Sequence, residues 1–272
     1  MDFVRAAASA RSAENCGAEE SGQNTNAGAA EDTTRLAESW DAAAEEWIAW
    51  ARRPGHDSYD VFHRAAFLPL IPAPAGLTAD LGCGEGRVTR DLAAKGHRVI
   101  GFDRSLTMCR AVRTHPTQPM PAVVTDAARL PLPGNSVDCV VAFMALHDID
   151  AMHETVAEIA RILRPGGRLV FAVVHPVNSV GGFTGQGPDR PFVINESWFE
   201  RHRRLDEVAR DGLHMTFHSV HRPLQDYTEA LADAGFLIER LREVTNPDPA
   251  NSWHRMPMFL HVRAVRLADT HR

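Results

Sequence analysis

The sequence lacks the features that typify membrane, secreted and metal-binding proteins. No segment approaches the ~20 consecutive apolar residues that cross a bilayer. The first residues, MDFVRAAASARSAENCG, also lack the apolar run of a signal peptide. None of the four cysteines belongs to a C-x-x-C pair. We therefore expect a cytoplasmic protein with reduced thiols, no membrane contact and no metal site.

Basic residues are too few and too scattered for a nucleic-acid-binding surface. The chain has 29 Lys and Arg against 35 Asp and Glu, a formal net charge of −6, and no basic tract. Proteins that bind nucleic acids concentrate basic side chains because phosphate contacts dominate their affinity. The composition therefore argues against a nucleic-acid partner, while 44% hydrophobic residues in a chain of 272 suffice for a full core.

Composition divides the chain into three segments. Residues 1–34 contain almost no large apolar side chains and predict a disordered N-terminal tail. Residues 35–74 carry tryptophans at helical spacing and predict a helical lid, which ends at two prolines. The main domain is then expected over residues 75–272.

Within the main domain, apolar strands alternate with amphipathic helices as far as Pro176. Such alternation predicts a parallel sheet with helices on both faces, the doubly wound α/β class. Residues 177–220 are rich in Gly, Arg and His and weakly periodic, so we expect an insertion on the substrate side. One more amphipathic helix and two closing strands are expected after it.

A glycine-rich motif, Asp80-Leu-Gly82-Cys-Gly84-Glu-Gly86, follows the first strand and opens a helix. Glycines there let the backbone approach a ligand closely, and a helix N-terminus offers free N–H groups. The dinucleotide fingerprint G-x-G-x-x-G places its third glycine one residue later, where this sequence has Arg87. The spacing and the preceding acidic residue therefore disfavour a dinucleotide.

Acidic residues end the next two predicted strands. Asp103 closes the second strand, where a carboxylate can accept hydrogen bonds from both hydroxyls of a ribose. Arg104, beside it, is placed to lie against an adenine ring. Asp126 and Ala127 end the third strand and precede the segment LPLPGNSVD.

These blocks, with Ile162-Leu-Arg-Pro-Gly-Gly167, resemble the class I S-adenosylmethionine-dependent methyltransferases, in the type 11-like subgroup that acts on small molecules. The resemblance implies a Rossmann-like, seven-stranded, mostly parallel sheet with an antiparallel closing strand. It implies S-adenosyl-L-methionine as the cofactor. It assigns the cofactor contacts to Asp80, Gly82, Gly84, Gly86, Asp103, Arg104, Asp126, Ala127 and Phe143.

Two histidines are candidates for a catalytic base. Methyl transfer mainly requires positioning, and a base is needed only when the acceptor carries a proton at neutral pH. His147 follows the fourth strand and His175 ends the fifth, both at the carboxyl edge where ligands bind. The alternative role for His147 is to shape the cofactor pocket. Arg64, in the lid, is a candidate for contact with the cofactor carboxylate.

The expected activity is methyl transfer to oxygen, nitrogen or carbon of a small-molecule acceptor, in specialised metabolism. The fourth strand ends without the N/D-P-P-Y/F motif of enzymes that methylate nucleobase or glutamine amino groups. Two alternatives stay open: an NAD(P)-dependent oxidoreductase, disfavoured because no Tyr-x-x-x-Lys pair exists, and a non-catalytic S-adenosylmethionine-binding regulatory protein. A homodimer is the default expectation for the assembly.

Overall fold

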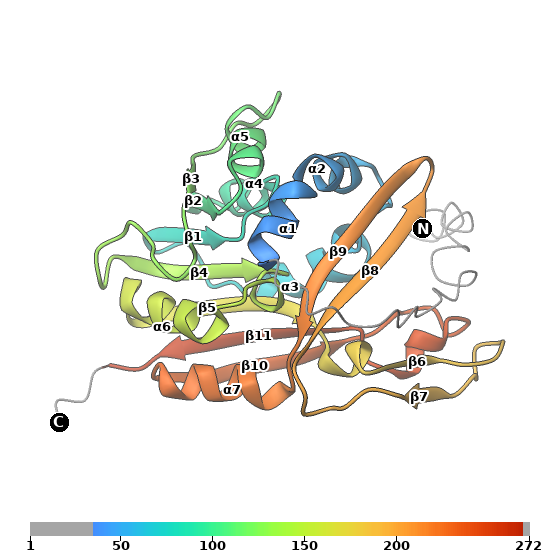
Figure 1. Cartoon of the computed structure of the whole chain (residues 1–272). Helices are drawn as coiled ribbons and strands as arrows, with labels where there is room; N and C mark the ends of the chain where they lie inside the picture. The colour runs from blue at the N-terminus through green and yellow to red at the C-terminus, as the bar shows by residue number, and fades with distance from the viewer. Residues whose placement is uncertain (1–34, 269–272) are drawn as a thin grey trace, which may run out of the picture.

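A seven-stranded sheet forms the centre of the protein in the computed structural model, which describes residues 35–268 (Figure 1). The tail predicted over residues 1–34 lies outside the described residues. The strand order is β10-β11-β5-β4-β1-β2-β3. The strands are β1 (Leu77–Leu81), β2 (Arg98–Asp103), β3 (Ala122–Val124), β4 (Val137–Phe143), β5 (Leu163–Val174), β10 (Phe236–Val244) and β11 (Phe259–Arg266).

Strands β1 to β5 run parallel to one another, whereas β11 runs antiparallel to both β5 and β10. This arrangement confirms the predicted doubly wound sheet with an antiparallel closing strand. Because parallel strands end at the same edge, the residues that follow β1, β2 and β4 are brought together there, although they are far apart in sequence.

Helices cover both faces of the sheet, since successive strand residues point to opposite sides. On one face Val140 and Ala142 share a core with side chains of α6 and α7. On the other face Val141 and Phe143 share a core with side chains of α3 and α4. These helices are α3 (Arg64–Phe67), α4 (Arg87–Ala94), α6 (Met152–Ile162) and α7 (Leu224–Asp233), and α5 (Leu106–Arg113) lies against β2 and β3.

The N-terminal part of the described chain is helical, but its helices are shorter than the sequence predicts. The helical spacing of its tryptophans predicts a continuous helix through this segment, whereas α1 (Leu36–Ala42) and α2 (Ala44–Arg52) are separated at Ala43. Alanine favours helix and gives no signal for this break. A π-helical turn (Tyr59–His63) then precedes α3.

Residues 181–221 contain two antiparallel hairpins, which were not predicted for the insertion expected over residues 177–220. They are β6 (Gly181–Phe183) with β7 (Phe192–Ile194), and β8 (His202–Arg210) with β9 (Leu213–His221). Most residues of β8 are exposed or half-buried, so the strand shows no clear apolar alternation. Strand β9 packs against α1 and α2, and we call these three elements the roof (Figure 1).

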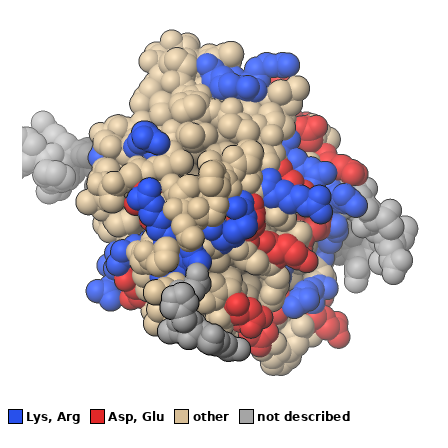
Figure 2. All heavy atoms as spheres, turned by 90° about the vertical axis from the view of Figure 1, so that its left-hand side faces the viewer, with Lys and Arg blue, Asp and Glu red and all other residues tan. Residues whose placement is uncertain are grey.

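The outer surface carries charges of both signs. Figure 2 shows the side that lies at the left of Figure 1, where basic and acidic side chains are mixed. Within residues 35–268, no helix is both long enough and apolar enough to span a bilayer.

Candidate functional site

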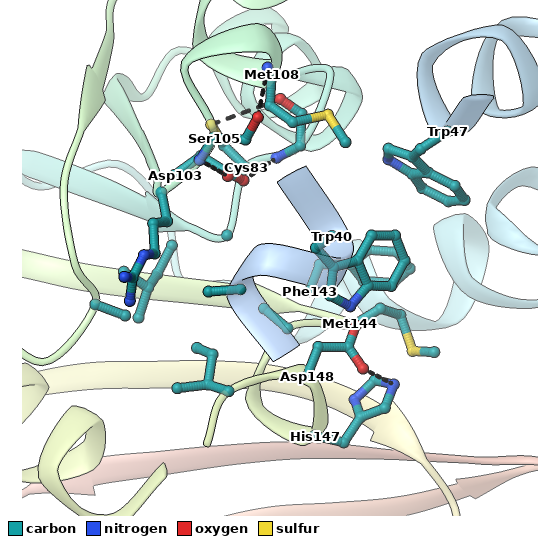
Figure 3. A pocket seen from close by; sticks show the side chains of 18 of the residues that line it. Trp40, Trp47, Cys83, Asp103, Ser105, Met108, Phe143, Met144, His147 and Asp148 are labelled. Atoms are coloured by element: carbon teal, nitrogen blue, oxygen red, sulfur yellow. Dashed lines mark hydrogen bonds and ion pairs between the residues drawn. The ribbon is translucent and has the colours of Figure 1, made fainter. Parts of the chain in front are cut away.

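A cavity of about 870 Å³ lies at the carboxyl edge of the sheet, between the strand ends and the roof. Its wall includes the glycine-rich turn after β1, the ends of β2 and β4, and side chains of the roof (Figure 3). Ligand pockets typically measure about 300–1,000 Å³, so this cavity is large enough for a cofactor with a small acceptor beside it.

The glycines of the glycine-rich turn leave space that the Cβ atom of any other residue type would fill. Gly84 has a φ of +53°, and a Cβ added there would lie 3.2 Å from Nε1 of Trp47 in the roof. A Cβ at Gly82 would meet the Cβ of Ala145 at 2.5 Å. Both glycines line the cavity, whereas Gly86 does not: it precedes α4 and packs closely against Val112.

Asp80 lies beneath this turn and is 1% exposed. Its carboxylate accepts a hydrogen bond from the hydroxyl of Thr89 at 2.6 Å, and its side chain has no cationic partner within residues 35–268. Burial raises the pKa of Asp80 to about 7, against 3.8 for a free side chain. A cation bound in the cavity would favour its ionised form.

Asp103 holds the end of β2 to the glycine-rich turn. One carboxylate oxygen accepts from the backbone N–H of Gly84, and the other accepts from that of Ser105, both at 2.9 Å. Burial nevertheless raises the pKa of Asp103. A carboxylate oxygen has more than one lone pair, so these bonds leave acceptor capacity for a ligand.

The adenine-side residues predicted from the sequence also line the cavity. Arg104 and Asp126 form an ion pair at 3.4 Å, and both are about half exposed. Asp126 also accepts from the backbone N–H of Ala128. Ala127 and Phe143 complete the set, so Gly86 is the predicted cofactor residue that lies outside the cavity wall.

The first catalytic candidate, His147, lies in the cavity wall next to Asp148 (Figure 3). Its Nε2 is 3.4 Å from a carboxylate oxygen of Asp148, and its Nδ1 is buried without a hydrogen-bond partner among the described residues. Burial lowers the pKa of His147 to about 3 and raises that of Asp148. The imidazole is therefore neutral at physiological pH. Met144, three residues before His147, has a φ of +51°, a strained conformation typical of functional sites.

Two other predicted residues lie outside the cavity wall. His175 is buried, its Nε2 contacts Glu243 at 3.1 Å, and its Nδ1 accepts from the backbone N–H of Val177. Arg64 is about half exposed and donates two hydrogen bonds to the carboxylate of Asp91, at 2.7 and 2.8 Å. Neither side chain is placed to touch a ligand in the cavity.

Arg87 was not predicted as a site residue. It occupies the position at which a dinucleotide fingerprint has its third glycine. Its guanidinium lies 4.9 Å from the ring centre of Trp47 and 5.2 Å from that of Tyr59, and it pairs with Asp57. Arg87 and Asp57 both line the cavity. Arg87 directly follows the motif, but Trp47 and Tyr59 come from a different segment, so their contact with Arg87 could not be predicted from the local sequence.

Arg222 was also missed, because its partners lie more than 70 positions away. It is 6% exposed, and its guanidinium donates to the carbonyls of the loop that carries His147 and Asp148. The accepting carbonyls belong to Leu146, His147, Ile149 and Asp150, at 3.5, 3.3, 2.6 and 3.3 Å. Arg222 thus fixes the loop without contacting the cavity.

The part of the chain that the structure describes contains no cluster of three or more histidine, cysteine or acidic side chains able to hold a metal ion. Instead, the cavity combines a backbone turn open for close approach with carboxyl groups suited to hydroxyl and cationic groups. S-adenosylmethionine offers a sulfonium, an ammonium group and a ribose diol, so the residues present fit it.

Comparison with known proteins agrees with this geometry. Residues 79–171 match the family model described as a methyltransferase domain. An uncharacterised methyltransferase of Mycobacterium bovis is 39% identical over 100 residues, which cover 37% of this chain and 40% of that protein. A mouse tRNA (carboxymethyluridine(34)-5-O)-methyltransferase is 26% identical over 192 residues, which cover 68% of this chain and 24% of that protein.

Among solved structures, an S-adenosylmethionine-dependent methyltransferase from Mesorhizobium loti superposes with a TM-score of 0.61 and 26% identity. The match covers 74% of this chain and 96% of that one. The chain carries a class I S-adenosylmethionine-dependent methyltransferase domain.

Proposed function

We propose that the protein transfers a methyl group from S-adenosylmethionine to a small-molecule acceptor. The observation that carries this proposal is that one roofed cavity contains both the predicted cofactor residues and a second, aromatic region beside them. A small acceptor fits such a shared cavity, since bringing two reactants together there removes water and supplies orientation.

The cofactor supplies an electrophilic methyl carbon on a sulfonium. The glycine-rich turn would hold its methionine part, Asp103 its ribose hydroxyls, and Asp126 with Ala127 its adenine. His147 and Asp148, on the loop after β4, would hold the acceptor, and Asp148, whose pKa is raised by burial, would accept a proton from it. Trp40, Trp47 and Phe217 of the roof would exclude water from the cavity.

A tRNA acceptor is suggested by the mouse relative alone, and the cavity argues against it. Eight carboxyl side chains and four arginines line the cavity, an unfavourable environment for phosphates. The sequence also contains no basic tract. The acceptor proposal therefore favours uncharged or cationic small molecules.

The first test is calorimetric titration of S-adenosylmethionine, S-adenosylhomocysteine and NADH into the wild type, Asp103→Asn and Asp189→Asn. We expect the two sulfur ligands to bind the wild type and NADH not to bind. Asp103→Asn should weaken binding by about 10- to 100-fold, the range for a hydrogen bond to a charged group. Asp189 is exposed and lies outside the cavity, so Asp189→Asn should bind like the wild type.

The acceptor class is tested by the release of S-adenosylhomocysteine from S-adenosylmethionine. Turnover with a low-molecular-weight metabolite fraction, and none with purified tRNA, is expected. NADH binding without S-adenosylmethionine binding would refute the cofactor assignment. Turnover with tRNA alone would refute the small-molecule acceptor.

A further inference from the structure

The carboxyl groups of the cavity divide into those that are neutralised and those that are not. Ion pairs join Arg87 to Asp57 and Arg104 to Asp126. Arg203 pairs with Asp150 at 3.1 Å. Of the four arginines, three are thus already matched, and the fourth, Arg35, is exposed.

Two further carboxyl groups of the wall are matched by arginines outside it. Glu85 binds Arg90 at 2.7 Å and Arg52 at 3.3 Å, and Asp206 binds Arg204 at 2.9 Å. Within residues 35–268, this leaves Asp80, Asp103 and Asp148 as carboxyl groups of the wall without an arginine partner.

Asp80 and Asp103 adjoin the glycine-rich turn, where the cofactor's own ammonium and ribose would lie. Asp148 belongs to a different region, on the loop after β4, among Trp40, Phe143 and Met144 (Figure 3). One half-buried carboxyl group, with its side chain 16% exposed, therefore faces the cavity beyond the part that the cofactor requires.

Within residues 35–268, no cationic side chain forms an ion pair with Asp148 other than the contact with His147. His147, its contact at 3.4 Å, is 6% exposed and neutral, and its own Nδ1 has no partner among the described residues. The charge of Arg222 lowers the pKa of Asp148, but burial outweighs it and the pKa stays raised. The guanidinium itself donates to backbone carbonyls. A buried carboxylate without a cation is costly, and a ligand that brings a positive charge offsets that cost.

We propose that the acceptor is an amine with an apolar or aromatic body, held at its nitrogen by Asp148. This inference rests on the methyl transfer proposed above and narrows its acceptor. The indole of Trp40, in the same wall, favours a nearby cation through its π face. An anionic acceptor would be repelled, and an alcohol would leave the carboxylate without a counter-charge.

The chemistry of an amine acceptor balances at this site. The ammonium form binds and gives one proton to the Asp148 carboxylate. The nitrogen lone pair then forms the C–N bond as the C–S bond breaks. The electron pair of the broken bond stays on sulfur, so the sulfonium becomes a neutral thioether and the product is an N-methylammonium.

Three probes of similar size test this inference: 2-phenylethylamine, 2-phenylethanol and 3-phenylpropanoate. Each is titrated into protein saturated with S-adenosylhomocysteine, using the wild type, Asp148→Asn and Asp189→Asn. We expect the amine to bind at least about tenfold more tightly than the alcohol, and the carboxylate not to bind. Asp148→Asn should remove the preference for the amine and leave binding of S-adenosylhomocysteine within about twofold, while Asp189→Asn keeps the preference.

If Asp148→Asn does not fold, the affinities of the wild type for the three probes still test the amine proposal. Equal binding of amine and alcohol, or stronger binding of the carboxylate, would overturn the amine proposal and leave the methyltransferase proposal intact. The same holds if Asp148→Asn keeps the full preference. Failure of S-adenosylhomocysteine to bind would instead refute the proposed function, and the amine proposal with it.

Discussion

At the scale of single residues, the site depends on groups whose properties differ from those of the same side chains in water. Asp80 is a carboxyl group with a pKa of about 7, His147 an imidazole with a pKa of about 3, and Gly84 a residue with a positive φ. Each departure has a local cause: burial for the first two, and the tight turn between β1 and α4 for the third. Asp80 and Gly84 each lead to a prediction about stability or cofactor binding.

Gly84→Ala should abolish tight cofactor binding. The added methyl group lies 3.2 Å from the Trp47 indole, in the space left for a ligand. Gly185→Ala is the matched control, since Gly185 has a φ of +84° but open space around it. Both variants should lose about 1 kcal/mol in the free energy of unfolding, measured in urea. Affinity for S-adenosylhomocysteine should fall at least about tenfold in Gly84→Ala alone; equal affinities would show that the turn does not contact the ligand.

Asp80 should make the ligand-free protein less stable as the pH rises. Its pKa is 3.8 when exposed and about 7 when folded, so between these values the folded protein binds more protons than the unfolded one. Stability from Asp80 is then greatest near pH 4 and declines up to about pH 7, by at most about 1.4 kcal/mol per pH unit. Thermal unfolding of wild type and Asp80→Asn at several pH values measures this difference. Parallel curves for the two proteins would contradict it.

At the scale of elements, the sequence predicted those whose patterns are local. The alternation of apolar strands and helices, the turn at Asp80 to Gly86 and the acidic ends of β2 and β3 are all visible as short patterns. The break at Ala43 is not, because alanine favours helix. The hairpin of β8 and β9 is not either, because tertiary packing of half-exposed strands decides it. The contacts of Arg222 were hidden for the same reason: its acceptors are backbone carbonyls of a distant loop.

Replacement of Arg222 should loosen the loop between β4 and α6. Arg222→Gln cannot reach the carbonyls of that loop together, so buried acceptors lose their donor. We expect a loss of at least about 2 kcal/mol in the free energy of unfolding, measured in urea. Arg110 is exposed on α5, and Arg110→Gln should change stability by less than about 0.5 kcal/mol. A loss of similar size in both variants would mean that Arg222 does not support the loop.

At the scale of the whole molecule, the roof joins distant parts of the chain. The indole N–H of Trp40 in α1 donates to the carbonyl of His218 in β9 at 2.8 Å, and Trp50 in α2 packs with Met215. Trp40, Trp47 and Phe217 lie at mutual centroid distances of 6.0 to 6.5 Å. The roof therefore behaves as one unit over the cavity.

Cofactor binding should slow amide hydrogen exchange in all parts of the roof together. Saturation with S-adenosylhomocysteine fills the cavity beneath α1, α2 and β9, and exchange in these elements should decrease along with that of the glycine-rich turn. The hairpin of β6 and β7 does not line the cavity and serves as the internal control. Protection of the turn without protection of the roof would show that the roof does not respond to the ligand.

The hydrogen bond between Trp40 and His218 also has a consequence for how the protein is made. Translation proceeds from the N-terminus, so α1 and α2 leave the ribosome long before β9. Until then their tryptophans have no Phe217 to pack against, and the glycine-rich turn stands open to water. A nascent chain can form β1 to β5 in order, but it cannot enclose a cofactor until the segment around residue 218 has emerged.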